Sequence, residues 1–376
     1  MKIFLLSDGK SIHTKRWIDS LLQNNHDIYL FSLNEVLNNS KNLSVHRGIN
    51  NFGKLDYILS IPMLNKIAKE IEPDIIHAHY LTGYGIMAGR IKINRPLILS
   101  PWGSDVFVTL RGNNLYSKLL RYLVRPALEK AIFITTETKI MADILKNEFN
   151  IDENKLKVIP WGIDLNTFKI VSEKNVLKKK LGIPKDSFII TSIRSITEFY
   201  RIHEIVKAIP KILNFHKNMN MFFIFVAGYL DSYYFGQIKE LIRKLNISQN
   251  IQTFDRFLSP KKVSDLLNIS NIVISIPPSD SVPISILEGM ACGCIPVVSN
   301  TFGTKELSDN SKFKLVFTTG KAIDLTEKLI DIINRYSTIK NEIIPWNLNI
   351  VKEKYSWEFS YTEMENLYKE AIKNFE

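Results

Sequence analysis

Residues 272–299 read IVISIPPSDSVPISILEGMACGCIPVVS, and this stretch decides the fold. Its two ends, Ile272–Ile276 and Ile295–Ser299, are continuous apolar runs rich in β-branched residues. Such runs are typical of strands in parallel sheets that are covered on both faces. Between them lie a polar loop and an apolar segment that begins at Pro283 and ends before Gly293, which predicts a short helix. The stretch therefore predicts a strand, a loop and a helix, followed by the next parallel strand.

The same alternation of apolar runs and helical stretches occurs twice along the chain. The other runs are Ile3–Leu6, Ile75–His79, Leu97–Leu99, Ile132–Thr135 and Lys157–Ile159, then Ser187–Ile193 and Met221–Ala227. The most polar break, Asp164–Asp186, separates the two sets. A chain of 376 residues is long enough for two domains. We therefore expect an α/β fold with two doubly wound, Rossmann-like domains, at 1–165 and 166–345, followed by a helical segment at 346–376.

Composition limits the class of protein. Apolar residues make up 45% and charged residues 23%, the balance of a soluble globular protein, and two cysteines exclude a disulfide scaffold. No apolar window reaches the about 20 residues of a spanning helix, and the apolar run at the amino terminus is too short for a signal peptide. The net charge of +11 favours anionic partners. We expect a cytoplasmic protein, or one peripheral on the inner face of the cell membrane.

The predicted helix at Pro283 lies at the carboxyl end of a strand, where open parallel sheets bind ligands. Its N-terminus, with Ser279 or Ser281 as the expected N-cap, offers free N–H groups to an anion such as a diphosphate. Glu288 lies inside this otherwise apolar helix, and a carboxylate there needs a partner. In one interpretation the carboxylate binds ligand hydroxyls or a cation. In the other it forms a structural salt bridge with a neighbouring Lys or Arg.

Asp280 and Glu288, eight positions apart and followed by Gly-Met-Ala-Cys-Gly, resemble the acidic-x(7)-Glu signature of the family-4 glycosyltransferases. The resemblance implies the GT-B fold, two Rossmann-like domains that face each other across a cleft. It implies that Glu288 holds the ribose hydroxyls of a nucleotide-sugar and that Asp280 contacts the donor sugar. The family's usual first residue is glutamate. The backbone that would line the sugar and diphosphate is that of Ser281, Val282, Pro283 and Ile284.

Four further blocks are similar to this family and occur in its order. They are Asp8–Trp17, Ile75–Tyr80, Pro101–Val106 and Val158–Leu165. The first resembles a βα loop that approaches donor and acceptor, and the resemblance places Gly9, His13 and Trp102 on the acceptor side. It also implies that the last helical segment crosses back to pack on the first domain.

Two further positions depart from the family pattern. A histidine that hydrogen-bonds the donor sugar in many relatives is replaced by Trp102. Its polar role then passes to Asp105 or His13 as catalytic groups, or is dispensed with; the alternative is that Trp102 itself stacks on a sugar face. In the diphosphate clamp Arg194 matches the expected arginine. Arg201 stands near the lysine position, and the alternative for Arg201 is an exposed charge at a helix start.

Cations at these positions have a chemical reason, because the leaving nucleoside diphosphate gains charge. Gly228, at the end of another strand, is also assigned to the donor site, and residues 255–258 to base selection. No Asp-x-Asp occurs in a suitable loop, so neither a metal nor another cofactor is expected besides the nucleotide-sugar co-substrate. His77 and His79 share a strand face without a third ligand, and Cys292-x-Cys294 lacks a second pair, so both are interpreted as structural.

The segment Tyr116–Ala131 carries Lys118, Arg121, Arg125 and Lys130 among apolar residues. It is either an interfacial helix on anionic lipid or a surface helix that packs on the core, and Pro126 is expected to kink or break it.

Together these features predict a retaining hexosyltransferase. It would move a sugar from a nucleotide-diphosphate-sugar to a hydroxyl of a glycan or lipid-linked acceptor, in the synthesis of a surface polysaccharide such as lipopolysaccharide. The alternatives are a sugar-nucleotide epimerase of the same fold and a basic nucleic-acid-binding protein. The dispersed cations and the absence of a nucleic-acid motif argue against the latter.

Overall fold

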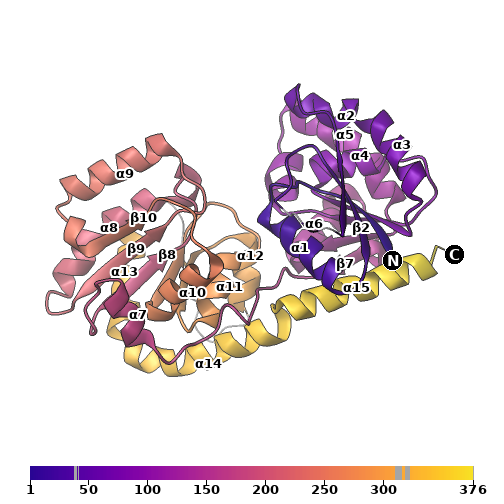
Figure 1. Cartoon of the computed structure of the whole chain (residues 1–376). Helices are drawn as coiled ribbons and strands as arrows, with labels where there is room; N and C mark the ends of the chain where they lie inside the picture. The colour runs from indigo at the N-terminus through magenta and orange to yellow at the C-terminus, as the bar shows by residue number, and fades with distance from the viewer. Residues whose placement is uncertain (38–39, 41, 310–315, 318–321, 376) are drawn as a thin grey trace. The chain divides into compact units, whose positions relative to one another are not determined.

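The structure is a computed structural model, and it describes residues 1–37, 40, 42–309, 316–317 and 322–375. The chain forms two compact units, each with its own sheet (Figure 1). Unit 1 comprises Met1–Pro160 and Tyr361–Glu376, and unit 2 comprises Trp161–Ser360. Each unit is described by itself below.

Unit 1 is built on a parallel seven-stranded sheet with the order β3-β2-β1-β4-β5-β6-β7. Its strands are β1 Lys2–Leu6, β2 Asp27–Ser32, β3 Leu43–Arg47, β4 Ile75–His79, β5 Leu97–Ser100, β6 Phe133–Thr136 and β7 Leu156–Val158. In the centre Leu5 of β1 lies between Leu30 of β2 and His77 of β4. The strand order reverses between β1 and β4, so the carboxyl ends of these strands form the expected binding edge.

The helices of unit 1 cover both faces of this sheet. They are α1 Ile12–Gln23, α2 Asp56–Leu59, α3 Ile61–Ile71, α4 Ile86–Ala88, α5 Leu115–Lys130, α6 Lys139–Phe149 and α15 Trp357–Lys373, with π-helical turns at Leu81–Gly85 and Asp105–Leu110. Ser11, Asn114 and Thr138 cap α1, α5 and α6 through their side chains. The expected break at Pro126 is wrong, because α5 continues through it to Lys130.

Unit 2 carries a parallel sheet with the strand order β10-β9-β8-β11-β12-β13. Its strands are β8 Phe188–Ser192, β9 Met221–Val226, β10 Ile251–Phe254, β11 Ile272–Ser275, β12 Ile295–Ser299 and β13 Val316–Phe317. Its helices are α7 Lys174–Lys180, α8 Ile202–Phe215, α9 Ser232–Lys244, α10 Pro260–Ile269, α11 Ile284–Ala291, α12 Phe302–Asp309, α13 Ala322–Asn334 and α14 Tyr336–Lys354. Adjacent residues of β8 pack into different hydrophobic cores on the two faces of the sheet. Ile190 packs in the core on the α8 side, and Ile189 packs in the core on the α10 side.

The chain passes between the units twice, and the two passages pair with each other. Ile163 forms a parallel bridge with Ser356, through N–H bonds of 2.8 Å from Ile163 to Tyr355 and from Trp357 back to Ile163. A Cβ at Gly162 would lie 2.1 Å from the Ser356 carbonyl oxygen, so this close approach requires glycine. This pairing keeps residues 161–165 with unit 2, whereas the sequence placed them in the first domain.

The carboxyl-terminal helices are shared between the two units, whereas the sequence predicted one helical segment at 346–376. Ile350 and Val351 of α14 are buried against α11, so α14 stays with unit 2, and only the part from Tyr361 onward belongs to unit 1. There Tyr368 is fully buried, and its hydroxyl hydrogen-bonds with His77 Nδ1 at 2.7 Å. Glu365 lies 3.4 Å from His26 Nε2 and Glu370 lies 3.8 Å from Lys157 Nζ.

Candidate functional site

The donor loop predicted from residues 272–299 follows β11 and leads into α11. Pro283, expected as the first helical residue, is instead the N-cap of α11, with φ −74° and ψ 109°. The helix therefore begins at Ile284, and no side chain caps it. The expectation that Ser279 or Ser281 caps it is wrong. Gly293 follows the helix end with φ +86°, as predicted. The first N–H groups of α11 therefore lack a side-chain cap among the described residues.

Arg194, in the loop after β8, joins the donor loop to α11. Its Nη2 lies 2.9 Å from Asp280 Oδ2, and its Nη1 donates a hydrogen bond of 3.0 Å to Ser285 Oγ. The guanidinium also stacks over the Tyr200 ring, 4.3 Å from the ring centroid. Burial raises the pKa of Asp280, and the charge of Arg194 counteracts this only in part. Arg194 and Asp280, predicted separately for the diphosphate and the sugar, thus form an ion pair.

Glu288 lies on the face of α11 that is least covered. Within this helix only Ile284 and Glu288 are partly exposed, and they are four residues apart and so share one face. The Val282 side chain, by contrast, is buried in the core beside Ile286 and anchors the loop. Glu288 therefore lies on the most accessible face of α11, and its contact with ribose hydroxyls stays a prediction.

The first turn of α12 also contacts the donor loop and holds it in position. Gly303 N–H donates to the Asp280 carbonyl at 3.2 Å, and a Cβ on Gly303 would lie 2.1 Å from the Ser281 carbonyl carbon. Ser281 Oγ is buried and has no hydrogen-bond partner among the described residues. Gly303 was not predicted as a site residue; the Phe-Gly-Thr turn that follows β12 was the available signal.

Arg201 lies beside the donor loop. It is the N-cap of α8 with φ +51°, and its Nη1 is buried without a hydrogen-bond partner in the described part of the chain. A cavity of about 580 Å³ is lined by Glu198, Phe199, Arg201, His203, Glu204 and Pro278. Arg201 therefore stands at a helix start and lines a cavity that Pro278 of the donor loop also lines, and its contact with a diphosphate stays a prediction.

Gly228 is exposed at the end of β9, and a Cβ there would meet only Ser195 Oγ, at 3.7 Å. A smaller cavity of about 210 Å³ lies beside the segment assigned to base selection and includes Phe254, Arg256 and Leu258 in its lining. These positions leave open space along the carboxyl edge of the unit 2 sheet.

In unit 1 the predicted acceptor residues lie beyond the carboxyl ends of β1 and β5. Gly9 N–H donates to Ser32 Oγ at 2.9 Å, and a Cβ on Gly9 would lie 2.7 Å from the Glu35 carbonyl oxygen. His13, near the start of α1, lies edge-on to Trp102 with ring centroids 5.9 Å apart. Burial, with a smaller contribution from Arg16, lowers the pKa of His13 to about 4, so the imidazole is neutral at pH 7.

Trp102 is part of an aromatic group, with the His79 ring centroid at 5.5 Å and the Tyr80 ring centroid at 6.2 Å. The following residue, Gly103, has φ +93° and allows the tight turn. Asp105 lies beneath this turn and is fully buried. Its carboxylate accepts N–H bonds from Leu81 at 2.7 Å and from Trp102 at 3.1 Å.

These bonds make Asp105 a group that orients two loops. Burial raises its pKa to about 6, although the backbone N–H groups counteract the shift. The fully buried carboxylate holds Trp102 in place; direct action of Asp105 or His13 in catalysis stays a prediction.

His77 and His79 are both buried and have hydroxyl partners. His77 hydrogen-bonds with Tyr368 and, through Nε2, with Ser100 Oγ at 2.7 Å, while His79 Nδ1 hydrogen-bonds with Ser7 Oγ at 2.9 Å. Burial lowers the pKa of His77 to about 3. Among the residues that the structure describes, no three His, Cys, Asp or Glu side chains converge as a metal site. Cys292 and Cys294 are buried free thiols.

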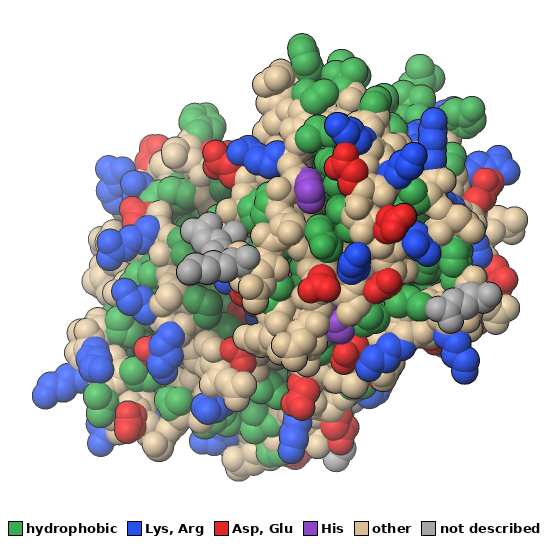
Figure 2. All heavy atoms as spheres, turned by 45° about the vertical axis from the view of Figure 1, so that its right-hand side comes forward, with side chains coloured by type: hydrophobic (Ala, Val, Ile, Leu, Met, Phe, Trp, Pro, Cys, Tyr) green, Lys and Arg blue, Asp and Glu red, His purple; other side chains and the backbone are tan. Residues whose placement is uncertain are grey.

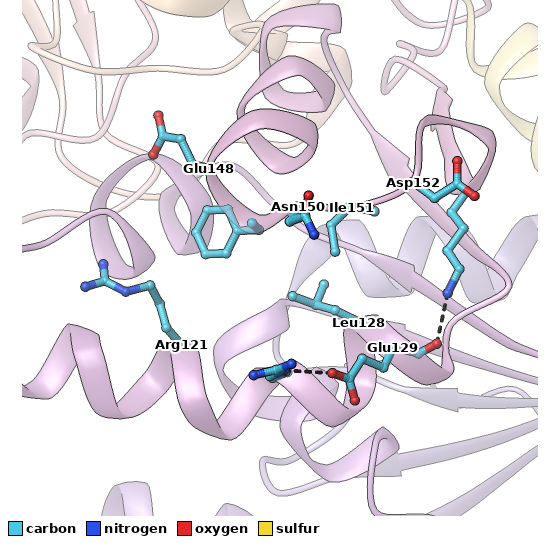
Figure 3. Close-up of a pocket in the computed structure, with 10 residues that line it drawn as sticks. Arg121, Leu128, Glu129, Glu148, Asn150, Ile151 and Asp152 are labelled. Atoms are coloured by element: carbon cyan, nitrogen blue, oxygen red, sulfur yellow. Dashed lines mark hydrogen bonds and ion pairs between the residues drawn. The ribbon is translucent and has the colours of Figure 1, made fainter.

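A further cavity, of about 590 Å³, lies between α5 and α6 (Figure 3). Its lining includes Arg125, which pairs with Glu129 at 2.7 Å, and Lys155, which donates to the Glu129 carbonyl at 2.9 Å. The residues come from the ends of α5 and α6 that lead into β6 and β7. This cavity is therefore near the amino ends of the strands, away from the predicted acceptor residues.

The comparisons with known proteins agree along the chain. Residues 2–138 match the family model described as glycosyl transferase 4-like, and residues 173–343 match the one described as glycosyl transferases group 1. The chain is 24% identical to an uncharacterized glycosyltransferase of Methanocaldococcus jannaschii, over 97% of this chain and 95% of that one. It is 25% identical to UDP-Gal:alpha-D-GlcNAc-diphosphoundecaprenol alpha-1,3-galactosyltransferase of Escherichia coli, over 67% of this chain and 64% of that one.

Among solved structures, Anabaena HepE in complex with UDP matches this fold with a TM-score of 0.83 at 16% identity. The match covers 98% of this chain and 100% of that one. It establishes two Rossmann-like domains in the GT-B arrangement of elements, as predicted.

Proposed function

Since this chain belongs to the glycosyltransferases, with one family model matching each of its two units, we propose that it transfers a hexose from a nucleotide-diphosphate-sugar to a hydroxyl group of a glycan or lipid-linked acceptor, with retention of configuration. The single observation that carries the donor side is the contact of Arg194 with both Asp280 and Ser285, at the start of the helix that presents Glu288.

The donor site needs three kinds of contact, and unit 2 supplies each. The uncapped N-terminus of α11, with Arg194 and Arg201, suits a diphosphate, because N–H dipoles and guanidinium groups both bind phosphate oxygens. Glu288, on the same helix one turn further, suits two ribose hydroxyls, since an ionised carboxylate accepts several hydrogen bonds. Asp280, at the tip of the loop, suits a sugar hydroxyl.

The reaction that this site supports breaks the bond between the anomeric carbon and the diphosphate oxygen and forms a bond to the acceptor oxygen. The acceptor proton passes to the leaving diphosphate, whose charge Arg194 and Arg201 stabilise. Attack on the face that the diphosphate leaves retains configuration without an enzyme nucleophile. Independence from metal ions and other cofactors stays part of the proposal.

The acceptor side is proposed for unit 1, at Gly9, His13 and Trp102. The indole ring of Trp102 offers an apolar face for a sugar, and the neutral imidazole of His13 beside it offers a hydrogen-bonding group. A role in surface polysaccharide or lipopolysaccharide synthesis, at the inner face of the cell membrane, is consistent with the galactosyltransferase named above, whose substrate carries a diphosphoundecaprenol group. No described helix is long and apolar enough to cross a membrane.

The two alternatives have no support from these findings. The family models and the relatives described above are glycosyltransferases, and none is an epimerase or a nucleic-acid-binding protein.

The test is a thermal-shift screen with UDP, GDP, ADP, TDP and CMP, each with magnesium and with EDTA. A ligand at a hundred times its dissociation constant adds about 2.7 kcal/mol of apparent stability. We expect one diphosphate to raise the melting temperature equally in both conditions, and Glu288→Gln to reduce that shift. An unchanged shift in Glu288→Gln would remove Glu288 from the site, and no shift with any nucleotide would overturn the proposal. The anomeric configuration of the product, determined by NMR, tests retention.

A further inference from the structure

Unit 1 exposes large apolar side chains on two neighbouring segments. In residues 52–63 these are Phe52, Leu55, Ile58, Leu59 and Met63, and in residues 108–122 they are Val108, Leu115, Tyr116, Leu119 and Tyr122. Leu115 is 84% and Tyr122 74% exposed. We name these ten side chains the apolar surface. A set of this size on two short segments is unusual for a face that meets only water.

The two segments lie side by side. Lys54 Nζ is 4.4 Å from the centroid of the Tyr116 ring, which joins the turn before α2 to the start of α5. Figure 1 draws α2 and α5 together at the top of this unit, and at the same height in Figure 2 hydrophobic side chains line the upper edge. The ten residues therefore form one surface.

The helix α5 is apolar on two opposite faces. Leu120, Val124 and Leu128 are buried in the core of unit 1. Leu115, Leu119 and Tyr122, at positions i, i+4 and i+7, form an exposed stripe. From the sequence, α5 could either pack on the core or rest on lipid; the structure shows that the core uses only one of its two apolar faces.

The charge around this surface is net positive. Residues 49–66 and 106–125 contain six cationic side chains, Lys54, Lys66, Arg111, Lys118, Arg121 and Arg125, and a single carboxylate, Asp56. Three of these cations pair with carboxylates outside the two segments: Lys66 with Glu70, Arg111 with Glu148 and Arg125 with Glu129. The excess positive charge therefore comes from Lys54, Lys118 and Arg121. Asp56 is buried and accepts the Phe52 N–H at 3.0 Å. Apolar side chains bordered by cations are complementary to a bilayer that contains anionic phospholipid.

The surface is also continuous with the predicted acceptor side. Val108 lies in the helical turn Asp105–Leu110, and Asp105 of that turn holds the Trp102 loop. A bilayer that contacts Val108 and Leu115 would lie close to the loop that carries Trp102.

We propose that the apolar surface rests on an anionic phospholipid bilayer and thereby brings a lipid-linked acceptor to the Trp102 loop. The membrane contact stands on the exposed side chains and the charge; the lipid-linked acceptor rests on the proposed function. Leu115, Leu119 and Tyr122 enter the interface between headgroups and acyl chains, while Lys54 and Lys118 meet the phosphates.

The experiment is co-flotation of the full chain with vesicles of phosphatidylcholine alone, or of phosphatidylcholine with an equal amount of phosphatidylglycerol. We expect binding to the anionic vesicles, weakened by salt, and little binding to the neutral ones. A variant with Leu115→Ser, Leu119→Ser and Tyr122→Ser should lose about tenfold or more in vesicle affinity. Lys54→Gln with Lys118→Gln should reduce the preference for anionic lipid.

A matched control changes three exposed apolar residues of unit 2, Phe215→Ser, Tyr233→Ser and Ile323→Ser, and should bind vesicles as the unchanged protein does. The proposal is overturned if neither vesicle binds, if both bind equally, or if the unit 1 variant keeps full affinity. It is also overturned if sedimentation shows that this surface joins two copies of the chain. The thermal shift with nucleotides should be the same in all these variants, which separates this failure from failure of the donor site.

Discussion

Arg194 Nη2 lies 2.9 Å from Asp280 Oδ2, so the cation proposed for the diphosphate and the carboxylate proposed for the donor sugar form one ion pair. Their side chains are 13% and 18% exposed, which makes the attraction less screened than in a surface pair. If Arg194 binds the diphosphate as proposed, we expect a bound diphosphate to compete with Asp280 for the same guanidinium. We then expect binding of the donor to release the carboxylate toward the sugar.

Asp280→Asn tests this competition. The variant lacks the charge that opposes the diphosphate at Arg194, so we expect the nucleoside diphosphate to bind more tightly, by several-fold, while sugar transfer falls. Arg194→Ala should weaken diphosphate binding by about tenfold or more, because a hydrogen bond to a charged group contributes about 1.5–3 kcal/mol. Titration calorimetry measures both affinities. If Asp280→Asn weakens diphosphate binding as Arg194→Ala does, the two side chains act together and not in competition.

Gly303→Ala should displace the donor loop. The added Cβ would lie 2.1 Å from the Ser281 carbonyl carbon, and backbone atoms cannot turn aside as a flexible side chain can. We expect a loss of nucleotide affinity together with a lower melting temperature. Gly236→Ala in α9 is the control, since its Cβ would meet no atom within 4 Å and alanine is the better helix former. Full nucleotide affinity in Gly303→Ala would mean that the loop position does not matter for binding.

Tyr368→Phe should destabilise unit 1 by about 1–3 kcal/mol, because it leaves His77 Nδ1 buried without a partner. Tyr361→Phe is the matched control on the same helix. The Tyr361 hydroxyl is buried and has no hydrogen-bond partner among the described residues, so its loss should be neutral or stabilising. Hydrogen exchange of the amides in β4 and α15 measures both effects. Equal protection in the two variants would show that the His77 hydrogen bond contributes nothing net.

Unit 1 should lose stability as the pH falls below about 6.5. Burial lowers the pKa of His77 to about 3 and of His13 to about 4, and it lowers the pKa of His79 as well. Between these values and 6.5 the unfolded chain binds protons that the folded one does not, so stability falls with pH by about 1.4 kcal/mol per pH unit for each histidine.

Denaturant unfolding, followed by hydrogen exchange of unit 1 between pH 7.5 and 5, measures this slope. His79→Asn can keep a hydrogen bond to Ser7 but cannot take up a proton in this range. It should therefore lower the pH slope of the unfolding free energy by the contribution of one histidine, about 1.4 kcal/mol per pH unit. An unchanged slope in that variant would show that His79 does not contribute.

Much of the fold could be predicted because buried parallel strands leave a direct signal. The nine apolar runs all became strands, from β1 to β12. The edge strands β3 and β10 were missed, because their residues are only partly buried or exposed and the sequence LSVHR or IQTF has no continuous apolar run. The strand β2 was missed although Ile28, Leu30 and Phe31 are buried.

The candidate site could be predicted only where its residues are close in sequence. Asp280, Pro283 and Glu288 are separated by one loop and one helical turn, so their spacing is informative. The ion pair with Arg194 joins residues far apart in the chain, and so does the hydrogen bond between His77 and Tyr368. The sequence offers no pattern for such contacts, because they depend on how separate elements pack. For the same reason the burial of Asp105 beneath two loops could not be predicted, because it follows only from how those loops fold.

The double passage of the chain at Ile163 and Ser356 has a consequence for biosynthesis. Unit 1 consists mostly of residues 1–160 but obtains residues 361–373 of α15 only after all of Trp161–Ser360 has been made. At about 5–20 residues per second, a ribosome takes roughly 10 to 40 s to synthesise that segment. During this time the partners of His26 and His77 on α15 have not been synthesised, so the nascent chain carries an incomplete first unit until residue 373 has been added.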